Sequence, residues 1–236
     1  VLKRDPYDQL ALAYLGTAWR LQDDPREAWL MDFDQMVRPV AVDAPPEFSS
    51  RDQFFQELKI CLEELHRSKA HPLEQTLRNG TQTNGYLFRL KHPLLRSLEQ
   101  QIRLAVSSAL ADFPVDPEHP FWGRRSVSPR GDGMSFSGAW SVRLHSEGFH
   151  ANHIHPEGWI SSALYIALPD EMERSGEHAG SIQFGVPLDI ALPPKRIIRP
   201  SVGTLVLFPS YMWHGTVPFT DPQPRITVAF DLVPEQ

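Results

Sequence analysis

Hydrophobic residues recur at helical spacing in the first half of the chain and in short alternating runs in the second half. Apolar positions three and four apart predict two helices within residues 5–37, with Pro25 in the first turn of the second. The same spacing predicts a helix over residues 49–66 and another over residues 94–113. The first half of the chain is therefore expected to be mainly helical.

After residue 113 the pattern changes to that of short strands. Most of the 22 prolines lie beyond this point and separate apolar runs that are too short for helices. The expected strands cover residues 137–144, 159–168, 181–184, 196–199, 204–208, 213–217 and 226–233. Such a series is typical of an antiparallel sandwich or barrel. Because the helices precede the strands, the predicted fold class is α+β, with N-terminal helices packed on one face of a jelly-roll barrel.

Two intervening segments follow neither pattern. Residues 37–46 contain three prolines and are expected to form a linker or an edge strand. Residues 70–90 are polar and contain glycine, which fits either a solvated loop or a lid over a functional site. If the segment is a lid, Gln75, Arg78 and Gln82 are its candidate contacts.

The predicted domain organisation places a helical hairpin over residues 1–38 and a main domain over residues 39–236. Within the main domain, residues 49–113 give helical support and residues from about 134 to 233 form the β core. The hairpin resembles the last unit of a tetratricopeptide array through Tyr14-Leu15-Gly16 and Ala18-Trp19. One such unit cannot bury its own face, so either further repeats precede it or it docks on the main domain. A plain helical hairpin is the alternative.

Composition and charge exclude several functional classes. A net charge of −6 without long runs of one sign argues against a basic nucleic-acid-binding surface. No apolar stretch approaches the roughly 20 residues that a membrane-spanning helix needs. Residues 1–5 lead into a polar segment, so we expect no signal peptide. The single cysteine, Cys61, excludes an internal disulfide and fits a reducing compartment, so a cytoplasmic location is expected.

Three histidines are the candidate metal ligands. His153 and His155 are two residues apart, so on a strand they would point to one face and could reach one ion. His214 follows about 60 residues later and is the expected third ligand. Three imidazoles suit iron, zinc, copper or nickel, and three protein ligands with vacant positions are typical of a catalytic site.

A second candidate group opens the last predicted strand. Arg225 lies eleven residues after His214, and Arg225 and Thr227 share a face of the strand by the same period of two. A guanidinium held beside a hydroxyl suits a carboxylate, which it can bind through two parallel hydrogen bonds. An anionic ligand near the metal is therefore expected.

These motifs, in this order, resemble the Fe(II)- and 2-oxoglutarate-dependent oxygenases, in particular the branch that carries a His-x-His motif. The resemblance covers residues 137–233 and rests on His153-Ile154-His155-Pro156, the strand ending in Tyr165, the segment from Gly203 to His214, and Arg225-Ile226-Thr227. It implies a double-stranded β-helix with His153, His155 and His214 as the metal ligands. It further implies that Arg225, helped by Thr227 and Tyr165, binds the distal carboxylate of the cosubstrate 2-oxoglutarate.

One departure from the superfamily pattern concerns the charge of the metal site. Most members have an Asp or Glu where His155 stands, within the two-histidine, one-carboxylate triad of non-haem iron enzymes. A third neutral imidazole leaves the site one unit more positive, so zinc or nickel could occupy it in place of Fe(II). Glu157 as a substitute carboxylate and His150 as a substitute ligand are the alternatives left open.

The resemblance implies a dioxygenase that hydroxylates a substrate while 2-oxoglutarate is converted to succinate and CO2. The alternative is a cupin-like three-histidine metalloprotein, with zinc or iron, that does not use 2-oxoglutarate. That class expects a Glu four or five residues after His-x-His, where this chain has Gly158-Trp159-Ile160. The substrate is expected to be a small molecule or a peptide or protein, and the N-terminal helices are a candidate surface for a protein partner.

Overall fold

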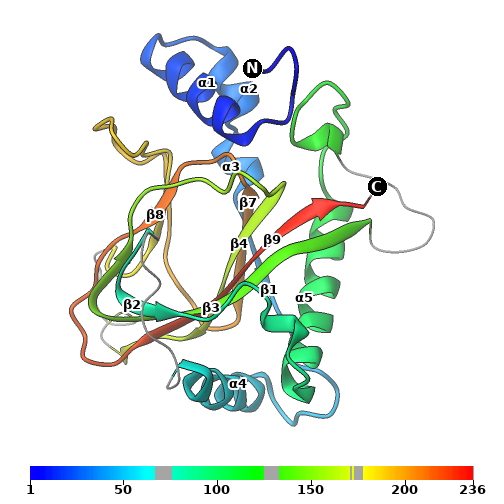
Figure 1. Cartoon of the computed structure of the whole chain (residues 1–236), viewed down its shortest axis with the longest axis vertical. Coiled ribbons are helices and arrows are strands. Elements are labelled where there is room, and N and C mark those ends of the chain that lie inside the picture. Colours follow the sequence, from blue (N-terminus) through cyan, green and yellow to red (C-terminus); the bar gives the residue numbers. More distant parts are fainter. Residues whose placement is uncertain (67–75, 125–132, 171, 173–177, 236) are drawn as a thin grey trace.

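The computed structural model describes residues 1–66, 76–124, 133–170, 172 and 178–235. Within these residues it is a mixed fold of helices and antiparallel sheets, in which all five α-helices precede the last seven strands while the first two strands lie between helices, in keeping with the predicted α+β class. Figure 1 shows helices above, below and along one side of the strands.

The helices match the predicted periodicity, with one correction near the N-terminus. The α-helices are α1 (Gln9–Leu21), α2 (Arg26–Leu30), α3 (Phe33–Met36), α4 (Arg51–His66) and α5 (Pro93–Ala111), and the 3-10 turns are η1 (Leu87–Arg89) and η2 (Trp122–Arg124). The second predicted helix is thus two short ones. The break has a local cause, because the Asp32 side chain accepts hydrogen bonds from the backbone N–H groups of Asp34 and Gln35 and so begins a new helix.

The strands form a six-stranded and a three-stranded sheet. They are β1 (Arg38–Ala41), β2 (Leu77–Gln82), β3 (Met134–His150), β4 (Ile160–Ala167), β5 (Ile182–Phe184), β6 (Arg196–Ile198), β7 (Thr204–Pro209), β8 (His214–Thr216) and β9 (Arg225–Pro234). The larger sheet has the order β1-β7-β4-β9-β3-β2 and the smaller one the order β6-β5-β8. All recorded strand pairs are antiparallel.

Two strand predictions need correction. Residues 77–82 were expected in an irregular loop but form edge strand β2, paired with β3 through a register shift between Arg78 and Gly80. The polar composition of β2 gave no strand pattern in the sequence, because an edge strand needs few apolar residues. Strand β3 is also longer than predicted and runs on to His150. Residues 38–41 form an edge strand on β7, which confirms that reading of residues 37–46. The lid candidate Gln75 lies outside the described residues.

The core lies between the larger sheet and the helices. Alternate residues of β9 enter the main hydrophobic cluster from one face, namely Ile226, Val228, Phe230 and Leu232. Helix α4 contacts β4 and β3, and α5 contacts β1. The N-terminal helices also touch the β region, since the Tyr211 hydroxyl donates to the Leu30 carbonyl at 2.9 Å and Leu30 belongs to the same cluster. The boundary near residue 38 and the tetratricopeptide-like character of the hairpin stay predictions.

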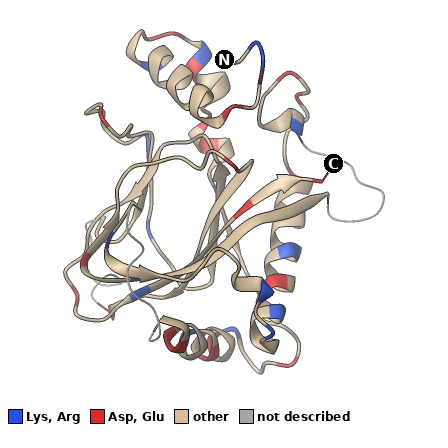
Figure 2. Cartoon of the chain, in the orientation of Figure 1, with Lys and Arg blue, Asp and Glu red and all other residues tan. Residues whose placement is uncertain are grey.

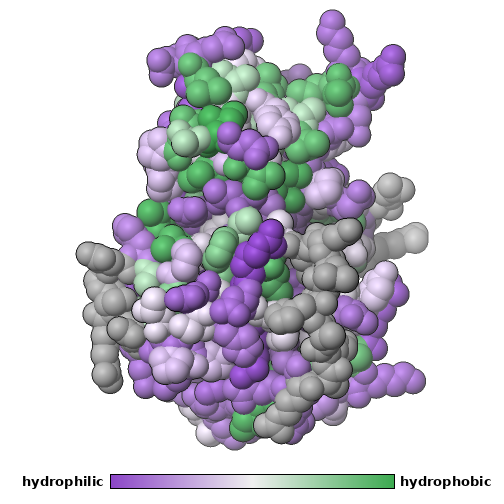
Figure 3. Space-filling model, turned by 60° about the vertical axis from the view of Figure 1, so that its left-hand side comes forward, coloured by the Kyte–Doolittle hydropathy of each residue, from purple (hydrophilic) through white to green (hydrophobic). Residues whose placement is uncertain are grey.

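Figure 2 shows acidic and basic residues distributed over helices, strands and loops among residues of other kinds. Hydrophobic residues gather at the upper end of the molecule, over the N-terminal helices (Figure 3). Large apolar side chains exposed there are Tyr7, Leu10, Tyr14, Leu21 and Trp29. No helix among the described residues is both long and apolar enough to cross a membrane.

Candidate metal centre

The two clustered histidines lie in an irregular loop and not on a strand, which corrects the sequence-based placement. Strand β3 ends at His150 and β4 begins at Ile160. His153 and His214 form an isolated antiparallel bridge, with N···O distances of 2.9 and 3.0 Å in the two directions. The His155 N–H donates to the Ser210 carbonyl at 3.0 Å. Backbone hydrogen bonds to the segment that carries His214 therefore fix the loop.

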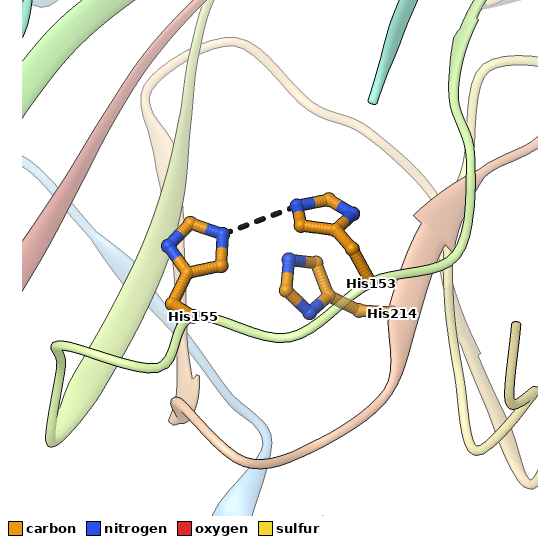
Figure 4. A group of neighbouring side chains, drawn as sticks. All are labelled: His153, His155 and His214. Atoms are coloured by element: carbon orange, nitrogen blue, oxygen red, sulfur yellow. Dashed lines mark hydrogen bonds between the residues drawn. The ribbon is translucent and has the colours of Figure 1, made fainter. Parts of the chain in front are cut away.

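The loop brings three imidazoles together. One ring nitrogen from each of His153, His155 and His214 lies within 4.8 Å of the others. The Nε2 atoms of His153 and His155 are 3.1 Å apart, the contact dashed in Figure 4. Figure 4 shows the three rings converging from two separate segments of the chain. This group of three is called the histidine end below.

Hydrogen bonds at Nδ1 determine which nitrogen of each ring faces the centre. Nδ1 of His153 lies 2.7 Å from the Ala151 carbonyl, and Nδ1 of His214 lies 2.9 Å from the Met212 carbonyl. Nδ1 of His155 lies 2.7 Å from the Asp231 carboxylate. These oxygens can only accept, so each Nδ1 carries the proton and each Nε2 presents a lone pair. Three lone pairs then point at one another.

The contact between the Nε2 atoms of His153 and His155 is consequently no ordinary hydrogen bond. Two unprotonated nitrogens 3.1 Å apart repel each other unless a cation lies between them. Metal–imidazole bonds of about 2.1 Å are compatible with that separation. The donor set thus fits a transition metal that imidazole prefers, such as iron, zinc, copper or nickel.

Burial favours the neutral form of two of the imidazoles, His153 and His214. Desolvation, followed by the positive charge that His155 would carry, lowers the pKa of His153 to about 4. Desolvation, followed by the charges of His153 and His155, lowers the pKa of His214 well below its usual value. Neutral imidazoles are the form that binds metals, so little proton release is needed at neutral pH.

A buried cation lies in the same cavity. Arg225 is 3% exposed, and its Nη1 donates to the Gly180 carbonyl at 2.8 Å. Among the described residues its Nε has no hydrogen-bond partner, and no carboxylate pairs with it. Burial lowers the pKa of this guanidinium, although arginine keeps its charge at neutral pH. A buried cation with an unused donor is poised for an anionic ligand.

The neighbouring predicted residues occupy two different places. Thr227 lines the cavity beside Arg225, on the same face of β9, as expected from the period of two. Arg225 and Thr227 are called the arginine end below. Tyr165 is fully buried outside the cavity lining, with the Arg225 guanidinium carbon 5.1 Å from its ring centroid. Its hydroxyl has no hydrogen-bond partner among the described residues.

The two ends share one cavity of about 440 Å³. Part of its lining is half-buried or exposed, and these polar or aromatic residues are called the rim: Thr76, Gln82, Trp140 and Glu157. The Trp140 ring stacks on His155 with 5.8 Å between ring centroids and an interplanar angle of 20°. A cavity of this size holds a small ligand beside the three imidazoles and still leaves an opening.

One residue of the site was missed in the sequence. Asp231 lies on the same face of β9 as Arg225 and Thr227, six residues after Arg225, and lines the cavity. Its carboxylate is 2.7 Å from Nδ1 of His155. The period of two from Arg225 was the signal that could have found it.

The alternative ligands lie near the centre but outside the cluster. The His150 ring centroid is 5.8 Å from that of His153, and its Nδ1 is 3.3 Å from the Thr76 hydroxyl. Glu157 is exposed at the rim. Of the described residues, only the three histidines form a metal-ligand group. Of the lid candidates, Gln82 lines the cavity, whereas Arg78 does not.

A family model described as "Putative 2OG-Fe(II) oxygenase" matches residues 138–231, under half of the chain. This segment contains both ends of the cavity and Asp231. A search among curated proteins gives no match.

Solved structures share the fold at low identity. A Pseudomonas putida prolyl-4-hydroxylase has a TM-score of 0.55 and 13% identity, over 95% of this chain and 100% of that one. A prolyl hydroxylase from Trichoplax adhaerens, bound to a hypoxia inducible factor peptide fragment, has a TM-score of 0.54 and 11% identity, over 92% of this chain and 93% of that one. A viral collagen prolyl hydroxylase from Paramecium Bursaria Chlorella virus-1, in a 2OG complex, has a TM-score of 0.53 and 12% identity, over 86% of this chain and 98% of that one. The family match supports an oxidoreductase of the 2OG-Fe(II) oxygenase kind, and the solved structures show the shared fold.

Proposed function

We propose that the chain is an Fe(II)- and 2-oxoglutarate-dependent dioxygenase that hydroxylates a substrate. The observation that carries this proposal is the shared cavity, which combines three neutral imidazoles at one end with a buried, unpaired cation at the other. A divalent cation completes the histidine end, and a carboxylate completes the arginine end. 2-Oxoglutarate offers both a chelating 2-oxo acid and a distal carboxylate.

In this proposal His153, His155 and His214 hold the metal through Nε2. Arg225 binds the distal carboxylate of 2-oxoglutarate, with Thr227 as a second donor from the same strand face. Tyr165 supports the guanidinium from behind through its ring. Bound iron supplies the oxidising chemistry, which converts 2-oxoglutarate and O2 to succinate and CO2 as a substrate C–H bond is hydroxylated. The protein orients the cosubstrate and limits access of water.

The proposed architecture is a double-stranded β-helix formed by the two sheets. His214 begins the edge strand β8 of the smaller sheet and Arg225 begins β9 of the larger one, so residues of both sheets line the cavity. In such an arrangement both sheets contribute to one site. The helices on the outer face of the larger sheet would stiffen the strand that carries Arg225.

The rim of the cavity is the proposed substrate entrance. Trp140 offers a flat apolar face next to His155, and Gln82 and Glu157 offer hydrogen-bonding groups. These groups suit a peptide or a small molecule that has both apolar and polar parts. One of the similar structures holds a peptide fragment, which is consistent with the first of these substrate classes.

The second candidate is a three-histidine zinc or iron protein that does not use 2-oxoglutarate. The lack of a carboxylate among the three clustered residues favours it, because neutral imidazoles also suit zinc, and nickel could bind in the same way. Arg225 argues against it. A site without a dicarboxylate ligand has no need of a buried, unpaired guanidinium.

Calorimetric titration of Mn(II)-loaded protein tests the proposal without turnover. We expect 2-oxoglutarate to bind, and to bind much more weakly when the metal is omitted. Glutarate is the matched control ligand because it has both carboxylates but no 2-oxo group. Equal affinity for 2-oxoglutarate and glutarate, or binding that is indifferent to the metal, would contradict the chelation and favour the second candidate.

A further inference from the structure

We propose that Asp231 is a positioning residue that supplies, through His155, the negative charge that a carboxylate ligand provides in the two-histidine, one-carboxylate sites. This inference rests on the proposed metal centre. It explains how a site with three imidazoles can have an anionic environment without a fourth ligand.

The contact is direct and short. Nδ1 of His155 lies 2.7 Å from the Asp231 carboxylate, and Oδ1 of Asp231 accepts a hydrogen bond from the Ser161 hydroxyl at 2.6 Å. The Ser161 and Ser210 hydroxyls are 2.9 Å apart, and both side chains are fully buried. Asp231 is therefore held in place from two sides, by a ring N–H and by a hydroxyl pair.

The charge of Asp231 has no other cationic partner in the described part of the chain. The residue is 8% exposed, and the ion pairs recorded there join it to His155 alone. A buried carboxylate without a cation is costly. A divalent ion on the far nitrogen of His155 would offset that cost, so metal and carboxylate stabilise each other across the ring.

The position of His155 explains why it needs this partner. The residue lies in the irregular loop, where no strand pairing fixes the direction of its side chain. Asp231 holds the Nδ1 edge of the ring, and Trp140 stacks on its face at 5.8 Å between centroids. The other two rings donate Nδ1–H to backbone carbonyls of residues two positions earlier, which are neutral acceptors. Only His155 has a charged acceptor, at the position where the superfamily pattern places a carboxylate.

A carboxylate behind a metal-bound imidazole orients the ring and makes Nε2 a better donor. The negative charge of Asp231 also favours the higher oxidation state of the metal, because in a medium of low polarity it attracts a trivalent ion more strongly than a divalent one. The stronger donation by Nε2 and the preference for the higher oxidation state both depend on the negative charge and not only on the hydrogen bond.

The test compares Asp231→Asn with Asp231→Ala. The Asn side chain has the same shape and can still accept from Nδ1–H, but it has no charge. The control is Asp221→Asn, since Asp221 is equally buried and accepts from the Gln223 N–H instead of a ligand ring. Co(II) affinity and the Fe(III)/Fe(II) midpoint potential are measured, with the melting temperature of the metal-free proteins as a check on folding.

We expect Asp231→Asn to weaken Co(II) binding by about 10- to 100-fold and to raise the midpoint potential, while the control changes neither. Asp231→Ala should lose at least as much affinity. If Asp231→Asn binds Co(II) like wild type at an unchanged potential, the charge has no role and the inference is overturned. If wild type itself fails to bind Co(II), the proposed metal centre is wrong as well. The two failures are therefore distinct.

Discussion

The histidine end and the arginine end of the cavity are built by opposite means. The histidine end consists of neutral groups on an irregular loop and a short bridge, and its lone pairs converge at 3.1 Å. The arginine end consists of a charged group on the first residue of a long central strand, with an unused N–H donor. One end lacks a cation and the other lacks an anion.

The difference indicates a single ligand set that satisfies both ends. A metal alone would leave Arg225 unpaired, and an anion alone would leave the lone pairs unshielded. A metal-chelating dicarboxylate meets both requirements within about 440 Å³. The two ends should therefore respond differently to substitution and pH.

Removing a ligand should have the largest effect and should be confined to the histidine end. We expect His214→Ala to weaken Co(II) binding by more than about 100-fold, beyond the losses typical of residues behind a ligand. The matched control is His150→Ala, since that ring is 5.8 Å from His153 but outside the cluster. Equal losses in the two variants by competition titration would show that the ligand assignment is wrong.

Removing the cation should leave the metal in place and strongly weaken cosubstrate binding. Arg225→Ala is expected to weaken 2-oxoglutarate binding by about 2–5 kcal/mol, the usual consequence of removing one member of a buried charge pair. Arg225→Lys keeps the charge but lacks the planar fork and should recover only part of the affinity. Calorimetry on the Mn(II)-loaded variants measures this affinity. Unchanged affinity in Arg225→Ala would show that the arginine end does not bind 2-oxoglutarate.

Acid should act on the histidine end of the metal-free protein. The pKa of His153 is about 4 in the fold against 6.5 for an ordinary histidine, so the unfolded chain binds this proton first as the pH falls. Stability is then fully present above about pH 6.5 and declines toward pH 4, by on the order of 2–3 kcal/mol for this group. Denaturant titrations at several pH values check this in wild type and His153→Asn, whose profile should be flatter. If stability falls with pH equally in wild type and His153→Asn, protonation of His153 does not cause the loss of stability in acid.

The smallest expected effect concerns the ring behind Arg225. Tyr165→Phe keeps the aromatic face and removes a buried hydroxyl that lacks a partner among the described residues. We expect a change in 2-oxoglutarate affinity of less than about 1 kcal/mol, and unchanged or higher stability, because an unsatisfied polar group is lost. A loss as large as that of Arg225→Ala would show that the hydroxyl itself contacts the cosubstrate.

Periodicity identified the regular elements well. The helices predicted over residues 49–66 and 94–113 correspond to α4 (Arg51–His66) and α5 (Pro93–Ala111). The period of two on β9 placed Arg225 and Thr227 together on the cavity wall. These patterns are local consequences of burial on one face. Asp231 obeys the same period and could have been found by extending it.

Other features depend on contacts that no local pattern records. His153 and His155 converge because backbone hydrogen bonds to His214 and Ser210 fold the loop, and not because a strand alternates. Strand β2 forms from a polar segment because β3 offers it an edge. The break between α2 and α3 depends on one capping side chain, Asp32. The sequence predicted that the three rings converge because His153 and His155 share one face of a strand. The structure has them in a loop, where backbone hydrogen bonds bring the rings together.

Anaerobic titration of Fe(II)-loaded protein with 2-oxoglutarate tests whether one ligand joins the two ends. A visible absorption band should appear in wild type as 2-oxoglutarate chelates the metal. In Arg225→Ala the band should need a much higher 2-oxoglutarate concentration, although iron remains bound. No band in an iron-loaded wild type, or a band that saturates equally in both proteins, would contradict the account.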